Sequence, residues 1–355
     1  MLRPAGALYI IDNIILRADG VSLRVSSSSR SSRRRARCGG LLPAWLCLLL
    51  LLPWMMSAAA APGASGKIDL DTFEKLRRTV ALPDGEKLAY IPLGDTGGTP
   101  VVLIHGYTDN ARDWVPLVPY LSPRFRLILI DLRGHGHSSK PECCYTRLDF
   151  AYDVKLLLDH LRIPKADIVG HSLGSVIAQT FAEFWPERTR RVVLISSSAG
   201  LPPGAPPPKA LSGAFAQIRD LQDPIDPNSP FMMEWWYSPT PVDPEFMRRQ
   251  REDSAAIPAR IWRAVLEQGL DPMFAGTELQ ATLPRLTAPT LLIWGSKDPL
   301  ITDDLRQTLI AGLPHAQVKV FDGLGHNPFW ENPAACGELI NGFLNDAPRA
   351  SGAQP

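Results

Sequence analysis

Apolar runs of four to six residues recur along this 355-residue chain, each bounded by polar or glycine-rich stretches. Runs that are apolar without alternation indicate strands buried on both faces of a parallel sheet. Such runs stand at 100–104, 126–131, 166–169, 191–195, 289–294 and 317–321. Helices that pack on the sheet are expected at 110–121, 148–161 and 175–182. The alternation predicts an α/β fold, with a mostly parallel central sheet and helices on both faces.

Two segments depart from this alternation. An antiparallel hairpin is expected at 73–90, with Pro83-Asp84-Gly85 as its turn. At 201–283 the chain is first proline-rich and then helical in pattern, and about 80 residues are too many for a loop in a compact domain. We therefore expect a helical insertion there. The predicted division is a core of 67–200 and 284–346, the insertion at 201–283, and a disordered tail at 347–355.

The first 66 residues have a different composition from the rest of the chain. A basic block at 30–37, an apolar run at 41–56 and small residues at 57–61 form the layout of a secretory signal peptide. The prediction is a protein that is secreted or periplasmic after cleavage. The alternative is membrane anchoring by residues 41–61, because this stretch approaches the ~20 residues of a membrane span. Residues 1–29 fit neither a signal nor a domain, and they are expected to be disordered.

Composition narrows the possible partners. Hydrophobic residues make up 45% and charged residues 21%, as in globular proteins, and the net charge is +1. A charge near zero gives no general attraction to nucleic acid, so a small-molecule partner and no nucleic-acid partner are predicted. After export the chain would keep Cys143, Cys144 and Cys336. A bridge from the adjacent pair to Cys336 and free buried thiols are both open, since adjacent cysteines bond to each other only in a strained ring.

The most informative motif is Gly170-His171-Ser172-Leu173-Gly174, which joins the strand at 166–169 to the helix at 175–182. A G-x-S-x-G motif at a strand-to-helix junction is the nucleophile elbow. The turn is so sharp that only glycine fits two residues on either side of the serine. The motif therefore predicts Ser172 as a nucleophile, with His171 as its neighbour and not as a second base.

A serine hydroxyl is a poor nucleophile until a neighbouring base takes its proton. His326 lies on a glycine-rich loop after the last predicted strand, and imidazole titrates near pH ~6.5, so it can accept and return a proton near neutrality. Asp298 follows the strand at 289–294 and would hold the imidazole in the correct tautomer. Asp298 could instead cap the next helix. Asp322 is the competing acid, but it is too close to His326 in sequence to swing behind it easily.

Together these segments resemble the α/β-hydrolase family over about Thr72 to Leu344. The chain order Ser172, Asp298, His326 matches the nucleophile, acid and histidine order of that family. The resemblance implies an oxyanion hole made of the backbone N–H groups of Tyr107 and Leu173. It also implies that the insertion is a helical cap over the active site, and that 131–138 is a structural turn beneath it. No cofactor is expected.

Three histidines raise the question of a metal. His105, His135 and His137 stand on two strand-end loops, but no carboxylate or cysteine joins them at ligand spacing. Histidines in this setting are more often packing and hydrogen-bonding elements. No metal site is predicted from the sequence.

The type of nucleophile narrows the reaction. Relatives that cleave carbon–halogen bonds or epoxides have an aspartate at the elbow, whereas Ser172 indicates an acyl-enzyme. The prediction is a serine carboxylesterase for a hydrophobic small-molecule ester, because the insertion is rich in aromatic and sulfur-containing residues. The residues expected at the substrate pocket are His171, Trp114, Trp235, Trp236, Trp262 and Trp330.

Two alternatives stay open. A lactonase or a C–C bond hydrolase would use the same nucleophile, and Arg260 or Arg263 could then bind a substrate carboxylate. A hydrolase-like receptor would bind a small ligand and turn it over slowly. Export argues against the C–C hydrolase, since that role is intracellular.

Overall fold

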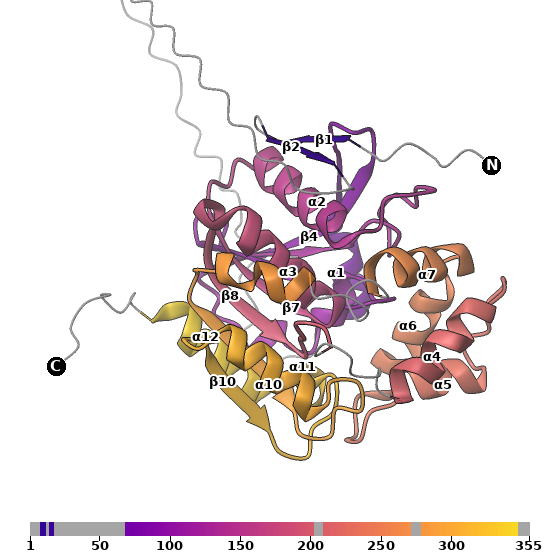
Figure 1. Cartoon of the computed structure of the whole chain (residues 1–355). Helices are drawn as coiled ribbons and strands as arrows, with labels where there is room; N and C mark the ends of the chain where they lie inside the picture. Colours follow the sequence, from indigo (N-terminus) through magenta and orange to yellow (C-terminus); the bar gives the residue numbers. More distant parts are fainter. Residues whose placement is uncertain (1–7, 12–13, 18–67, 202–208, 271–277, 347–355) are drawn as a thin grey trace, which may run out of the picture. The chain divides into compact units, whose positions relative to one another are not determined.

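The computed structural model describes residues 8–11, 14–17, 68–201, 209–270 and 278–346 (Figure 1). The chain divides into two compact units, residues 1–58 and 59–355. In the first unit, β1 (Leu8–Ile11) pairs antiparallel with β2 (Ile14–Arg17), so the expectation of disorder is wrong for these two apolar stretches. The basic block, the apolar run at 41–56 and the tail at 347–355 lie outside the described residues.

The second unit is built on an eight-stranded sheet in the order β10-β9-β8-β7-β5-β6-β4-β3. Neighbouring strands are parallel from β10 to β6, while the β6–β4 and β4–β3 pairs are antiparallel. The predicted α/β class is therefore confirmed. The strands are β3 (Arg78–Ala81), β4 (Lys87–Gly94), β5 (Thr99–Ile104), β6 (Phe125–Ile130), β7 (Ala166–His171), β8 (Thr189–Ile195), β9 (Thr290–Gly295) and β10 (Gln317–Phe321).

Burial follows strand position in the sheet. The inner strands β5, β7, β8 and β9 are buried almost throughout, as continuous apolar runs predict. β10 was expected to be buried as well, and this is wrong. It lies at the edge of the sheet, where Val318 and Val320 are exposed on either side of Lys319. The charge at Lys319 is typical of edge strands, which must not pair with other chains.

The core helices and short 3₁₀ turns connect the strands. They are α1 (Leu70–Lys75), η1 (Ala111–Trp114), η2 (Val118–Tyr120), α2 (Arg147–His160), α3 (Leu173–Phe184), η3 (Pro186–Arg188), η5 (Leu283–Arg285), α10 (Asp303–Gly312), α11 (Pro328–Glu331) and α12 (Pro333–Asn345). The helices predicted at 148–161 and 175–182 are confirmed. The helix predicted at 110–121 is wrong, because Pro116 and Pro119 remove backbone donors and leave two 3₁₀ turns. The hairpin begins only at Arg78, since Phe73 belongs to α1.

The insertion is largely helical over its described residues. Its elements are α4 (Lys209–Asp220), α5 (Pro230–Trp235), α6 (Pro244–Ala255), α7 (Ala259–Val265), the π-helical turn η4 (Leu266–Leu270) and α9 (Glu278–Thr282). Figure 1 shows α4, α5, α6 and α7 gathered in one group beside the sheet. The division into core and cap stays a prediction, because residues 59–355 cluster as one unit. In the described residues, no helix combines the length and apolar character that a membrane span requires.

The cysteines of the second unit do not form a long-range bridge. Cys143 and Cys144 are bonded to each other, and Cys336 is a buried free thiol. The bridge to Cys336 considered from the sequence is therefore wrong. Burial raises the pKa of Cys336 to about 12, so its thiol stays protonated and unreactive at neutral pH.

Asp131, at the end of β6, fixes the loops beneath the carboxyl ends of the strands. It accepts hydrogen bonds from the backbone N–H groups of Ala111 and His137, each 2.8 Å long, and it pairs with Arg77. Although burial alone would raise the pKa of Asp131, the hydrogen bonds of His137 and the charge of Arg77 hold it well below its usual range. The carboxylate therefore stays ionised inside the protein.

Replacing Asp131 by alanine leaves Arg77 and two backbone donors without this acceptor. We expect Asp131→Ala to lower the free energy of unfolding by about 3–5 kcal/mol at pH 7, measured by urea denaturation. Because the folded-state pKa is depressed, this contribution is present above the unfolded pKa of ~3.9 and is lost as the pH falls further. Asp322→Ala, at an exposed acid, is the control and should change stability by less than ~0.5 kcal/mol. An equally small effect of Asp131→Ala would contradict the assignment.

Candidate active site

Ser172 stands at the junction of β7 and α3, with a backbone φ of +49° and ψ of −119°. A non-glycine residue in this region is strained, and such strain persists only where surrounding structure holds it. The flanking glycines make the turn possible. A Cβ at Gly170 would lie 2.1 Å from the Gly174 carbonyl oxygen, and one at Gly174 would lie 2.2 Å from that of Ile104. The sequence argument for two glycines thus has a direct steric cause.

The imidazole of His326 is held by Asp298. His326 Nδ1 lies 2.9 Å from Asp298 Oδ2, while Asp298 Oδ1 accepts from the backbone N–H groups of Leu300 and Ile301 at 2.9 and 3.1 Å. Asp322 is exposed and accepts a hydrogen bond from Ser296 Oγ instead. The acid beside His326 is therefore Asp298, the one that the sequence favours. It reaches the imidazole because it follows β9, which pairs with β10, the strand before His326.

The main chain of His326 is held as well. Its carbonyl oxygen accepts from Ser196 Oγ at 2.7 Å and from His171 Nε2 at 3.0 Å. Ser196 follows β8, and His171 is the last residue of β7. The loop that carries His326 is thus bound to the ends of two parallel strands through its main chain, in addition to the Asp298 contact of its side chain.

Ser172 and His326 both line a cavity of about 470 Å³. Tyr107 and Leu173, the predicted oxyanion-hole residues, line the same cavity. Leu173 is the first residue of α3, so its N–H has no acceptor within the helix. The structure brings all five predicted catalytic and oxyanion-hole residues to one region, from four separate loops.

The predicted pocket tryptophans divide into two groups. Trp235 and Trp236 line the cavity, as does His171. Trp114, Trp262 and Trp330 are not among the residues that line this cavity. Trp114 is fully buried and stacks on Phe329, while the Trp330 indole donates to the Asp113 carbonyl.

Trp262 lies behind the wall of the cavity. It is fully buried, its ring packs against Tyr107 and Trp235, and its carbonyl accepts from the Tyr107 hydroxyl. Sequence reasoning also missed apolar residues of α4 and η4 that line the cavity, namely Leu211, Phe215 and Leu270. The spacing of Leu211 and Phe215 on one face of a helix was the signal that could have found them.

The two arginines proposed to bind a substrate carboxylate are engaged elsewhere. Arg260 donates to the carbonyls of Lys140 and Pro141, and Arg263 donates to that of Leu221. Neither lines the cavity, where the lysines are Lys209 and Lys297.

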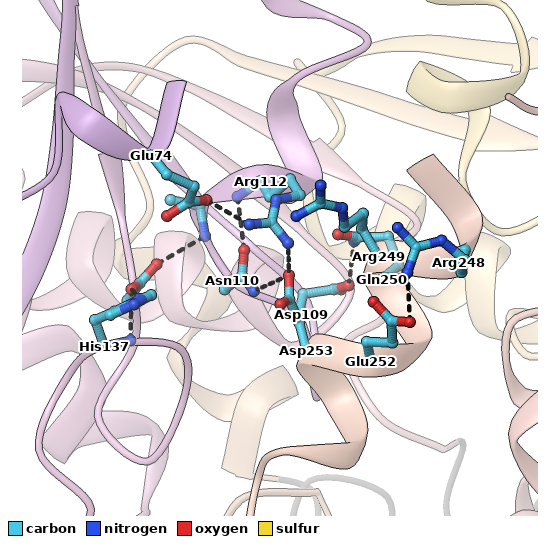
Figure 2. A network of polar contacts seen from close by, with 12 residues as sticks. Glu74, Asp109, Asn110, Arg112, His137, Arg248, Arg249, Gln250, Glu252 and Asp253 are labelled. Carbon is cyan, nitrogen blue, oxygen red and sulfur yellow. Dashed lines mark hydrogen bonds and ion pairs between the residues drawn. The ribbon is translucent and has the colours of Figure 1, made fainter. Parts of the chain in front are cut away.

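A polar network ties α6 of the insertion to the loop after β5 (Figure 2). Asp253 of α6 accepts from Asn110 Nδ2 at 2.8 Å and pairs with Arg112, which also pairs with Glu74 of α1. One turn earlier on α6, Gln250 donates to Asp109 at 3.2 Å. The loop that carries Tyr107 is therefore fixed to the insertion by buried polar groups, which no sequence pattern indicated.

The three histidines weighed as a metal cluster have other roles. His105 accepts from the Leu132 N–H through Nε2, and its ring packs edge-on against His135 at 5.3 Å. Burial lowers the pKa of His105 to about 4 and that of His135 to about 3, so both are neutral. His137 is largely exposed.

The structure instead brings together three other buried side chains of types that bind metals. Asp109, Asp113 and His171 have donor atoms that all lie within 4.8 Å of one another. Two carboxylates and an imidazole are a donor set that Zn²⁺ or Mn²⁺ can use. Asp109 lies in the loop after β5 and Asp113 in the short 3₁₀ turn η1, where sequence periodicity gives little information on which side chains turn inward.

The steric argument at the elbow is testable with a matched pair of glycines. Gly174→Ala forces a Cβ against the Ile104 carbonyl, so we expect loss of labelling by a fluorophosphonate probe and a lower melting temperature. Gly342→Ala, in α12 with nothing within 4 Å of the added atom, should label normally and gain up to about 1 kcal/mol in stability. Normal labelling of Gly174→Ala would refute the steric argument.

The sequence and fold match known proteins. A family model described as alpha/beta hydrolase fold matches residues 99–273 and 267–333. A 2-hydroxy-6-oxononadienedioate/2-hydroxy-6-oxononatrienedioate hydrolase of Cupriavidus pinatubonensis is 29% identical over 282 residues, which cover 76% of this chain and 95% of that protein. Lipase 1 of Psychrobacter immobilis is 27% identical over 268 residues, covering 72% of this chain and 79% of the lipase. The crystal structure of a hydrolase from Pseudomonas aeruginosa matches with a TM-score of 0.64 and 26% identity, over 76% of this chain and 98% of that one.

Proposed function

Because this chain belongs to the α/β-hydrolase fold family and is a hydrolase, we propose that it cleaves carboxylic esters of hydrophobic small molecules through an acyl-enzyme on Ser172. The observation that supports this most is the pairing of His326 Nδ1 with Asp298 Oδ2 at 2.9 Å, with His326 and Ser172 on one cavity. That pairing leaves Nε2 of the imidazole for the serine proton.

The proposed reaction has two steps. His326 takes the proton of the Ser172 hydroxyl as its oxygen attacks the ester carbonyl, and then gives that proton to the leaving alcohol. In the second step the same imidazole activates a water, which releases the acid and regenerates Ser172. The charge on the carbonyl oxygen would be met in both steps by the backbone N–H groups of Leu173 and Tyr107. Asp298 stabilises the imidazolium and stays ionised.

The cavity supports a hydrophobic acyl or alcohol group. Its walls next to Ser172 are Leu173 and Val176 of α3, and the insertion adds Phe231, Trp235 and Trp236. Trp235 is fixed by a 2.9 Å hydrogen bond from its indole N–H to Thr108 Oγ1, so its face is presented rigidly. A volume of about 470 Å³ is in the range of small-molecule sites, and it suits an ester of medium size.

A C–C bond hydrolase is the second candidate. The observation that favours it is the 29% identity to the nonadienedioate hydrolase. Such a dianionic substrate would need a cation, and Lys297, beside Asp298, is a cavity-lining candidate. A comparison of kcat/KM for a dienedioate and for a p-nitrophenyl ester series separates the two functions.

Removal of the nucleophile should abolish turnover and leave the fold intact. We expect Ser172→Ala to lower kcat for p-nitrophenyl esters by about 10³- to 10⁶-fold, with an unchanged melting temperature, and Asp298→Asn to lower it by about 10³- to 10⁴-fold. Burst kinetics measure acyl-enzyme formation directly. A single burst without turnover would instead support a slow ligand receptor.

The matched control is Ser198→Ala, a serine that lines the same cavity and has no proposed role in the reaction. Its kcat should stay within about threefold of the wild type. Retention of more than a tenth of the turnover by Ser172→Ala would overturn the acyl-enzyme proposal.

A further inference from the structure

His171, directly before Ser172, has a defined tautomer. Its Nε2 lies 3.0 Å from the His326 carbonyl oxygen, and because a carbonyl only accepts, Nε2 carries the hydrogen. Burial lowers the pKa of His171 well below its usual value, so the ring is neutral and Nδ1 holds a lone pair. No donor reaches Nδ1 from the described residues, and the carboxyl Oδ2 of Asp113 lies 3.8 Å away.

Asp113 is fully buried, and neither of its carboxyl oxygens accepts a hydrogen bond from the described residues. Burial raises the pKa of Asp113 well above the usual value, against a smaller lowering by the Trp330 indole N–H and the Gly106 backbone N–H. Burial also raises the pKa of the neighbouring Asp109. Arg112, the residue before Asp113 in the chain, is already paired with Glu74 and Asp253. An ionised Asp113 would face a bare lone pair with no counter-charge. A protonated Asp113 would instead donate to that lone pair.

We propose that Asp113 and His171 form a second, charge-neutral carboxyl–histidine pair that positions His326 from its main-chain side. The un-ionised Asp113 carboxyl donates to His171 Nδ1, after a small side-chain rotation closes the 3.8 Å gap. His171 then donates through Nε2 to the His326 carbonyl, beside the Ser196 hydroxyl. His171 and Asp113 are positioning residues for the loop that carries His326, although His171 also lines the cavity. The proposal rests on the proposed role of His326.

The charged and titratable groups around the pair come from every packed element. They are Asp109 and Arg112 on the loop after β5, His105 at the end of β5, His326 after β10, and Asp253 on α6. Asp109 also accepts from Gln250, so the pair is linked to the network of Figure 2. Because Arg112 is paired with Asp253 and Glu74, the neighbouring Asp109 carboxyl has no counter-charge among these groups, which favours a protonated Asp113.

The pH dependence has a definite sign. Because the folded-state pKa of Asp113 is raised, folding is favoured by this group below its unfolded pKa of ~3.9, and that contribution is lost as the pH rises toward the folded value. Asn at this position cannot ionise, and its amide N–H can still donate to His171 Nδ1. Asp113→Asn should therefore gain stability relative to the wild type as the pH increases.

The first experiment compares melting temperatures at pH 5 and pH 8 without substrate. The difference between Asp113→Asn and the wild type should become more positive by at least about 4 °C over this range. Glu252→Gln, an exposed paired acid on α6, should give a flat difference. A uniform loss of stability in Asp113→Asn at both pH values would overturn the proposal. So would stabilisation of the wild type, but not of the variant, by Zn²⁺ or Mn²⁺, because the carboxylate would then be a metal ligand.

The second experiment tests positioning through kinetics. His171→Phe keeps the ring that packs on His326 and Phe329 but removes the donor, so kcat should fall about 10- to 100-fold with KM within about threefold. His171→Gln can donate a hydrogen bond from a similar position and should recover most of the lost kcat. A wild-type kcat in His171→Phe would overturn the positioning role of His171. The melting experiment needs no turnover. Ser172→Ala could retain activity while the melting temperature of Asp113→Asn still rises relative to the wild type with pH. The proposed function would then have failed, but the neutral pair of Asp113 and His171 would stand.

Discussion

The site depends on one strained backbone position. Ser172 adopts a φ of +49° because the chain must reverse from a buried strand into a buried helix within a single residue. Such a conformation costs on the order of 1–3 kcal/mol and needs surroundings that over-determine it. The surroundings of Ser172 hold this conformation in two ways. Gly170 and Gly174 allow backbone contacts that any side chain would prevent, and the Ser172 N–H donates to the Ile195 carbonyl. The strain keeps the hydroxyl at the cavity and away from the sheet.

His326 comes from a region of the chain more than 150 residues away, and its position has to match that of Ser172 closely. Its side chain is held by Asp298 and its carbonyl by Ser196 and His171. Asp298 and Ser196 follow β9 and β8, and His171 ends β7; these are three adjacent parallel strands whose carboxyl ends meet at the same edge. Since each strand end is fixed by the sheet, the imidazole position follows from the strand register. A parallel sheet is thus the reason that Ser172 and His326, distant in sequence, line one cavity.

Sequence patterns predicted most of the sheet, because apolar runs report burial directly. They failed where burial does not depend on apolar character: β10 is an exposed edge strand, and Pro116 and Pro119 divide a segment with helical periodicity. At the site, Ser172, Asp298 and His326 could be placed from motif and chain order. The tryptophans could not, since burial in the core and exposure to a cavity favour the same residues. Trp114 is in the core and Trp235 lines the cavity, although both are aromatic residues in polar loops or short helices.

The buried polar groups were the least predictable part, and they explain how the insertion is coupled to the reaction centre. Asp109, Asn110, Arg112 and Asp113 lie within a stretch of five residues after β5, yet they face α6, α1 and His171 in turn. A movement of α6 would therefore change the surroundings of Asp109 and, through it, the charge balance at Asp113. Because buried carboxyls without counter-ions respond strongly to such changes, insertion position and the support of His326 are linked electrostatically as well as sterically. An insertion that only covered a cavity would not require this loop to carry four polar residues.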